Sequence, residues 1–213
     1  MKRTVFLIFS LSYFLTATMS QTDVTAQYLK NPSFEEDDIS SMPKDDTRGA
    51  YTATSITGWT LTGSYGVSDL MTAAATATDN NFGRPGNPSD GKQMYYIRHA
   101  WSAATANLLQ SVRLPAGTYR LRGDNKCITT GSHSAAIVAG SEQTSLTFLS
   151  SMPNQWNTTG VVFTLKAETA VNVGLTVNFG SGSGASVLID NFRLYQYPEG
   201  YVEPEDPTEQ DLT

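Results

Sequence analysis

Cysteine is almost absent from this sequence, because Cys127 is the single cysteine among 213 residues. A disulfide within the chain is therefore impossible, and a folded domain must be held together by its own core. A domain of about 150 residues buries about 70% of the surface that its unfolded chain exposes, which suffices without cross-links. We interpret Cys127 as a small core hydrophobe rather than as a reactive thiol.

Residues for acid–base and nucleophilic chemistry are also few. His99 and His133 are the two histidines, and the sequence has neither a Gly-x-Ser-x-Gly elbow nor a helical zinc motif. The acidic runs Glu35–Asp38 and Asp45–Asp46 consist of adjacent carboxylates. Such runs are more typical of solvated loops than of a glycosidase pair, whose carboxyl groups lie about 5–9.5 Å apart. No catalytic residue is assigned, and a binding protein is favoured over an enzyme.

Basic residues are outnumbered by acidic ones. The chain has 14 Lys and Arg against 20 Asp and Glu, which gives a formal net charge of −6. The sequence shows no basic patch, so the electrostatic footprint of nucleic-acid binding is missing. An acidic surface also disfavours anionic membranes and strongly anionic polysaccharides, whereas it is compatible with a neutral glycan.

Long hydrophobic runs are missing except at the N-terminus, where Val5–Leu15 follows two basic residues. This run is too short to span a membrane and has the pattern of a signal peptide. We predict a signal peptide over residues 1–26, with cleavage after Ser20 or after Ala26. The mature protein is expected to be exported to the periplasm, the cell surface or the medium, without membrane insertion.

Helical periodicity is scarce, and apolar and polar residues alternate instead. The clearest alternation runs over 171–179, and it recurs over 161–165 and 108–114. Further strands are expected over 93–101 and 134–139. Many short alternating strands separated by turns predict an all-β sandwich, barrel or jelly roll, in which each sheet has one polar face.

The sequence divides into one folded domain and a tail. The domain is expected over 27–197, and no convincing internal repeat occurs within it. From Pro198 on, acidic residues stand among prolines without any basic residue. This composition predicts a disordered tail, or a linker to another domain, over 198–213.

Two short acidic motifs stand almost a domain apart. Asn31–Glu35 opens the folded region and Ile189–Leu194 closes it, and each places a carboxylate beside a large apolar residue in a stretch that reads as a strand. If the two strands pair, Glu35 and Asp190 meet at one place. Such a meeting suits a hard cation with oxygen ligands, most simply calcium. The alternative is that both are ordinary carboxylates at strand ends, accepting backbone N–H bonds.

An ordered series of short motifs resembles the carbohydrate-binding modules of the galactose-binding-like jelly-roll type, which accompany secreted bacterial glycoside hydrolases and polysaccharide lyases. The resemblance covers roughly 28–197 and implies a two-sheet antiparallel jelly-roll sandwich. It also implies a structural calcium held by Glu35 and Asp190. The chain departs from many relatives at Asn191, where they have a second acidic residue. The motifs are Asn31–Glu35, Gly58–Trp59, Gly91–Ile97, Leu109–Tyr119, the strand from Trp156, and Ile189–Phe192.

Aromatic side chains near turns are the candidates for stacking on a sugar ring, a contact worth about 0.5–1.5 kcal/mol beyond area burial by analogy with aromatic pairs. The best cluster lies at the end of the strand 93–101, where Trp101 precedes a loop. Alternate residues of a strand point to opposite faces, so Tyr96 and Arg98 share one face while His99 and Trp101 share the other. Tyr65, in a glycine-flanked turn, is a further candidate for the rim of the site.

The function that these observations favour is non-catalytic carbohydrate binding by an exported bacterial β-sandwich module with a structural calcium. The expected partners are a neutral glycan and a tethered catalytic domain. One alternative is an accessory domain of a secreted polysaccharide-degrading enzyme, or a small version of such an enzyme. Another is a cell-envelope domain that binds proteins and has no sugar site.

Overall fold

The computed structural model describes residues 20–45, 50–64, 67–72, 86–100, 102–129, 131–151, 153–182 and 184–201. Two short helical turns occur there, α1 (Thr25–Tyr28) and the 3-10 turn η1 (Ile39–Ser41). All other regular elements are strands. They are β1 (Thr22–Asp23), β2 (Lys44–Asp45), β3 (Ala50–Thr52), β4 (Thr60–Gly63), β5 (Val67–Thr72), β6 (Gln93–Ala100), β7 (Ala104–Leu114), β8 (Gly117–Thr129), β9 (His133–Ala139), β10 (Glu142–Ser145), β11 (Phe148–Leu149), β12 (Asn157–Leu165), β13 (Thr169–Phe179) and β14 (Gly184–Gln196).

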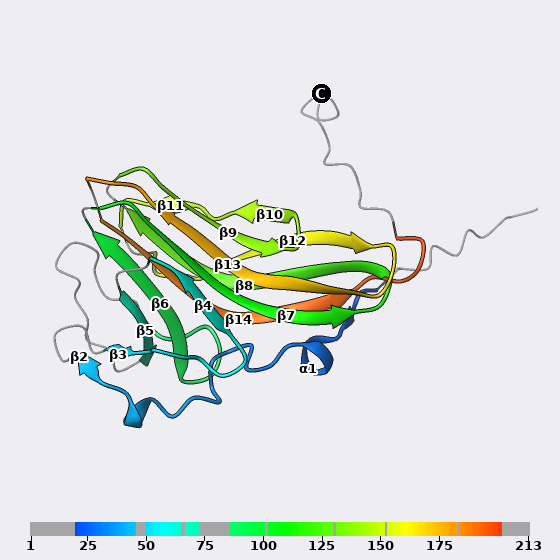
Figure 1. Cartoon of the computed structure of the whole chain (residues 1–213), viewed down its shortest axis with the longest axis horizontal. Coiled ribbons are helices and arrows are strands. Elements are labelled where there is room, and N and C mark those ends of the chain that lie inside the picture. The colour runs from blue at the N-terminus through cyan, green and yellow to red at the C-terminus, as the bar shows by residue number, and fades with distance from the viewer. Residues whose placement is uncertain are drawn as a thin grey trace, which may run out of the picture.

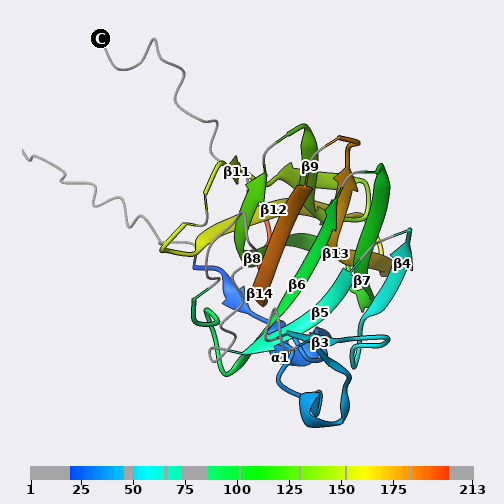
Figure 2. The ribbon, with the colours of Figure 1, turned by 90° about the vertical axis from the view of Figure 1, so that its left-hand side faces the viewer.

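The strands form two sheets packed face to face, which confirms the predicted all-β sandwich (Figures 1 and 2). The nine-stranded sheet has the order β11-β8-β14-β6-β5-β3-β2, with β1 added to β14 and β12 to β8. The five-stranded sheet has the order β10-β9-β13-β7-β4. Among the described strands the pairing is antiparallel except between β11 and β8, which run parallel.

The apolar side chains of the alternating segments fill the space between the two sheets. The apolar residues of β13, from Val171 to Phe179, are all buried in the core, and β13 pairs along its whole length with β7. The predicted strands over 93–101 and 134–139 appear as β6 and β9. Cys127 is buried in the core, and burial raises the pKa of its thiol to about 12, as expected for a residue used as a small hydrophobe.

The segment before Tyr28 belongs to the folded domain. β1 pairs with the end of β14, and the backbone N–H of Val24 donates to the Leu194 carbonyl at 2.9 Å. The Thr25 hydroxyl accepts the Leu194 backbone N–H at 2.8 Å. Of the two predicted cleavage points, the one after Ser20 retains these contacts, whereas cleavage after Ala26 would remove them. Residues 1–19 and 202–213, which hold most of the predicted signal peptide and tail, lie outside the described residues.

The opening motif is a turn, so the prediction that it forms a strand was wrong. Asn31 and Phe34 have φ of 51° and 63°, a region that a strand does not use. The Phe34 ring is fully buried against the rings of Trp59, Tyr95 and Phe192, with centroids 5.8, 5.9 and 6.4 Å away. The backbone N–H of Phe192 also donates to the Pro32 carbonyl at 2.9 Å. Both ends of the domain therefore meet at one aromatic cluster.

No helix in the described part of the chain has the length and hydropathy that crossing a membrane requires.

Replacement of Phe34 by alanine should lower the free energy of unfolding by about 3–5 kcal/mol, since it removes a large buried ring that cannot be replaced by collapse of its neighbours. Urea unfolding followed by tryptophan fluorescence measures this change. Leu149→Ala is the control, because Leu149 is 40% exposed and its loss should cost less than about 0.5 kcal/mol. Equal effects of the two substitutions would contradict the assignment of Phe34 as the anchor of the cluster.

Candidate functional site

Asp190 is the carboxylate that ties the last strand to a distant loop. Its Oδ2 accepts the backbone N–H groups of Ser89 and Asp90 at 2.8 and 3.0 Å, and the Ser89 hydroxyl at 3.1 Å. Its Oδ1 accepts the backbone N–H of Asn191 at 2.7 Å. Burial raises the pKa of Asp190 to about 7, although these donors oppose the shift. The carboxyl group is buried and both of its oxygens accept backbone N–H bonds, so it holds the loop in place.

Glu35 reaches the same loop from the opening turn. Its Oε1 accepts the backbone N–H groups of Lys92 and Gln93 at 2.8 and 2.6 Å. Glu35 and Asp190, 155 positions apart in the chain, thus bind N–H groups within one segment, Ser89–Gln93. The two segments meet through the bond from the Phe192 N–H to the Pro32 carbonyl, although the opening segment is a turn and not a strand paired with β14.

The oxygen atoms near the segment Ser89–Gln93 are the possible ligands of the expected calcium ion. The Oδ1 of Asn191 is buried and has no hydrogen-bond partner among the described residues, so a neutral amide oxygen follows Asp190 in the chain. Within the described ranges, no group of three or more His, Cys, Asp or Glu side chains is placed to hold a metal ion. A calcium ion takes six to eight oxygens, so backbone carbonyls and water would have to complete its shell. These oxygen ligands are of the type that calcium prefers, but only two of them, from Glu35 and Asp190, carry a negative charge.

Tyr96 and Arg98 lie on the outer face of the nine-stranded sheet, because they alternate along β6 with Tyr95 and Ile97, which point into the core. Tyr96 is only 4% exposed, and its hydroxyl lies 3.3 Å from the Ser186 hydroxyl on β14. Its ring is therefore part of the buried cluster on this face and offers no exposed surface to a sugar. Arg98 is half-buried at the end of β6, and Asp69 on β5 is opposite Tyr96 and fully buried.

Trp156 and Lys126 lie on this outer face over β8. The Lys126 ammonium sits 4.9 Å from the centre of the Trp156 ring, and the indole N–H donates to the Asn87 carbonyl at 2.9 Å. Lys126 is 2% exposed, and this burial lowers the pKa of its ammonium group. Trp156 is half-buried and packs against the apolar cluster that contains Tyr96. Trp156 therefore belongs to the face of the sheet opposite the main core.

The outer-face patch is the set formed by these residues: Asp69, Tyr96, Arg98, Lys126, Trp156 and Ser186. A buried lysine and a buried aspartate are costly in a protein interior. Here they stand on the face that does not build the main core. Of the six side chains, Trp156 and Arg98 are half-buried, so these two are the ones that a ligand on this face would contact.

The remaining predicted ligand-binding residues are distributed differently. His99 points to the other side of β6, with its ring 5.7 Å from Phe179 and its Nε2 2.8 Å from the Ser102 hydroxyl. It lies at the end of the sandwich beside His133, whose pKa is lowered by burial and by the charge of His99. Tyr65 and Trp101 lie outside the described residues. Their assignment to a sugar site stays a prediction.

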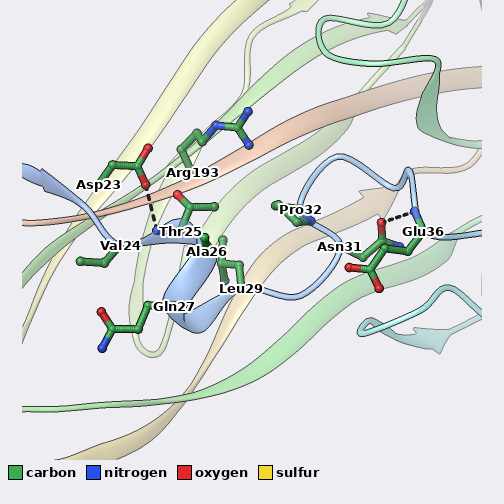
Figure 3. Close-up of a pocket in the computed structure, with 10 residues that line it drawn as sticks. All are labelled: Asp23, Val24, Thr25, Ala26, Gln27, Leu29, Asn31, Pro32, Glu36 and Arg193. Atoms are coloured by element: carbon green, nitrogen blue, oxygen red, sulfur yellow. Dashed lines mark hydrogen bonds between the residues drawn. The ribbon is translucent and has the colours of Figure 1, made fainter.

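A groove of about 760 Å³ lies beside α1, lined by Asp23, Leu29, Asn31, Glu36 and Arg193 among others (Figure 3). Asp23 and Arg193 come from the adjacent strands β1 and β14. The Arg193 guanidinium is engaged by Asp90 at 3.0 Å. None of the described residues that line the groove is aromatic, so they give it no stacking surface for a sugar ring.

Comparison with known proteins finds similar solved structures but no family. No protein-family model and no curated protein matches the sequence. Similar solved structures include TmCBM61 in complex with β-1,4-galactotriose, with 18% identity, a TM-score of 0.47 and coverage of 79% of this chain and 97% of that one. The CBM22-1 xylan-binding domain of Paenibacillus barcinonensis Xyn10C has 12% identity, a TM-score of 0.40 and coverage of 73% and 97%.

A family 11 carbohydrate-binding module from Clostridium thermocellum, in complex with a β-1,3-1,4-mixed-linked tetrasaccharide, is also similar. It has 10% identity, a TM-score of 0.36 and coverage of 66% of this chain and 90% of that one. These neighbours are carbohydrate-binding modules. At these identities and TM-scores the likeness carries no argument about the ligand of this protein.

Gly91→Ala should destabilise the protein more than Gly182→Ala. Both glycines have positive φ, 64° and 86°, so the backbone strain of about 1–2 kcal/mol is shared. A Cβ at Gly91 would lie 2.5 Å from the Glu35 carboxyl carbon, whereas one at Gly182 would meet nothing within 4 Å. Displacement of Glu35 would free two N–H groups, and we expect an additional loss of about 1–3 kcal/mol in chemical unfolding.

A double substitution tests the cause of that difference. In a Glu35→Ala background the clash is absent, so Gly91→Ala should cost no more than Gly182→Ala. An undiminished cost at Gly91 in this background would show that Glu35 is not responsible.

Proposed function

We propose that this protein is a non-catalytic glycan-binding domain whose ligand lies on the outer-face patch of the nine-stranded sheet. The observation that carries this proposal is the burial of Lys126 beside the Trp156 ring, on the face opposite the main core. The half-buried indole offers a flat apolar surface to a sugar ring, and the buried Lys126 ammonium packs against this ring. The half-buried Arg98 guanidinium is suited to donate to sugar hydroxyls. Arg98 extends the same patch toward the end of β6, where Trp101 follows.

The net charge of −6 supports a glycan that is neutral over most of its length, since a long polyanion would be repelled. Export through the predicted signal peptide would bring the domain to extracellular polysaccharides. Tethering to a catalytic domain through the acidic tail would raise the effective concentration of a weak binder.

Trp156→Ala should weaken glycan binding by roughly 3- to 10-fold, the equivalent of one lost aromatic contact. A glycan array identifies the ligand of the wild-type protein, and calorimetry then measures the variant. Trp156→Phe retains a ring and should lose less, which separates stacking from a general loss of structure. Arg113→Ala is the control, because that side chain is 71% exposed on the other sheet and pairs with Glu168. Absence of any bound glycan on a broad array would refute the proposed function.

We further propose that calcium stabilises the loop Ser89–Gln93, with Glu35 and Asp190 as its charged ligands and the Asn191 amide oxygen as a neutral one. Two carboxylates that converge on one segment and an unpartnered buried oxygen beside them support this assignment. When bound, the ion would neutralise two carboxylates and cross-link the opening turn to the last strand.

Calcium at 100 times its dissociation constant should stabilise the domain by about 2.7 kcal/mol, and EDTA should reverse this. Thermal unfolding with and without chelator measures the shift. Glu35→Gln should abolish the response to calcium, while Glu142→Gln, on an edge strand of the other sheet, should retain it. An identical melting temperature with calcium and with EDTA would rule out the ion.

A further inference from the structure

Two arginines stand on β8 at the end of the outer face away from Lys126. Arg120 and Arg122 alternate with the core residues Tyr119 and Leu121, so both point outward. In the sheet Arg122 is opposite Gly160 on β12 and Arg193 on β14, while Arg120 is opposite Tyr195. Residues distant in sequence thus form an arginine patch, defined as Arg120, Arg122, Arg193 and Tyr195.

The charges of this patch are only partly balanced. Arg122 and Arg193 are direct cross-strand neighbours, an arrangement of like charges that destabilises a sheet. Arg193 is neutralised by Asp90 at 3.0 Å. Arg120 and Arg122 make no ion pair with any residue that the structure describes, and the Nε of Arg120 is buried without an acceptor. A buried donor without an acceptor is unfavourable for the folded state.

Gly160 makes room for these two side chains. A Cβ at this position would lie 2.8 Å from Arg120 Nε and 3.0 Å from Arg122 Cγ. The Arg122 guanidinium carbon is 5.8 Å from the centre of the Tyr195 ring, within the range of a cation–π contact. The absence of a side chain on β12 therefore allows two guanidinium groups to lie over the sheet next to an aromatic ring.

We propose that the arginine patch binds an anionic substituent, a carboxylate or a sulfate, on the glycan that the outer-face patch holds. Guanidinium groups recognise such planar or tetrahedral oxyanions with paired N–H bonds, which a neutral hydroxyl cannot match. Tyr195 supplies an apolar surface for the sugar ring that carries the charge. This inference rests on the proposed function, and it makes the acidic group a local substituent of a mainly neutral chain, consistent with the net charge of −6.

The test compares glycans that differ only in charge. Calorimetry with the full-length mature protein would use short oligogalacturonates as free acids and as methyl esters, and sulfated galactan oligosaccharides before and after desulfation. Tighter binding of the free acid identifies a carboxylate site, and tighter binding of the sulfated form identifies a sulfate site. Equal affinity for the charged and uncharged member of both pairs would overturn the proposal.

Substitutions test whether the preference for a charged glycan arises at the arginine patch. Arg122→Gln should weaken binding of the preferred charged glycan at least tenfold and leave its uncharged counterpart unaffected. Arg122→Lys should recover only part of the loss, because lysine keeps the charge without the paired donors. Arg113→Gln changes the net charge equally on the other sheet and should have no effect. A loss of the same size for Arg113→Gln would overturn the proposal, as it would show a general charge effect.

Gly160→Ala provides a test that changes no charge. A methyl group there displaces both guanidinium groups, so affinity for the charged glycan should fall while the melting temperature stays within a few degrees. An unchanged affinity would contradict the geometry proposed for the patch. Binding of the uncharged glycans through Trp156 would persist in all these variants, so failure of this inference is distinguishable from failure of the proposed function.

Discussion

The packing of Phe34 against Trp59, Tyr95 and Phe192 is the interaction on which the candidate sites depend. It joins the opening turn, the segment before β4, the strand β6 and the last strand β14 in one cluster. Trp59 also donates its indole N–H to the Asn31 carbonyl at 2.9 Å, which fixes the turn that presents Phe34. Burial of large rings in one place compensates for the unfavourable positive φ of Phe34.

The two carboxylates are positioned by this cluster. Glu35 follows Phe34 directly, and Asp190 precedes Phe192 by two residues across the bulge of β14. Because the packed rings fix the backbone beside them, both carboxylates are directed toward the segment Ser89–Gln93 and accept its N–H groups. Four backbone donors, accepted by the buried Asp190 and the exposed Glu35, thus order the segment that leads into β6.

The sequence predicts the sandwich well and the sites only in part. Alternation over 171–179 reflects burial of one strand face, a property that neighbouring residues encode directly. The turn at Glu35 was missed because positive φ at Asn31 and Phe34 depends on contacts with distant rings. Lys126, Trp156 and the arginines were missed for a related reason. Their neighbours lie on β12 and β14, and the register that brings them together cannot be read from local composition.

Strand β8 connects the two proposed binding surfaces. Its outward residues run from Arg120 and Arg122, through Asp124, to Lys126, with Asp124 held by the Thr158 hydroxyl at 2.6 Å and by the Asn191 amide at 2.8 Å. At about 3.3 Å per residue, the distance from Arg120 to Lys126 is roughly 20 Å. The two arginines stand at one end of this row, the hydrogen-bonded Asp124 lies between, and Lys126 with Trp156 stands at the other end. This order along β8 fits the proposed binding of an extended glycan, with its acidic substituent at the arginine end and an uncharged ring near Trp156.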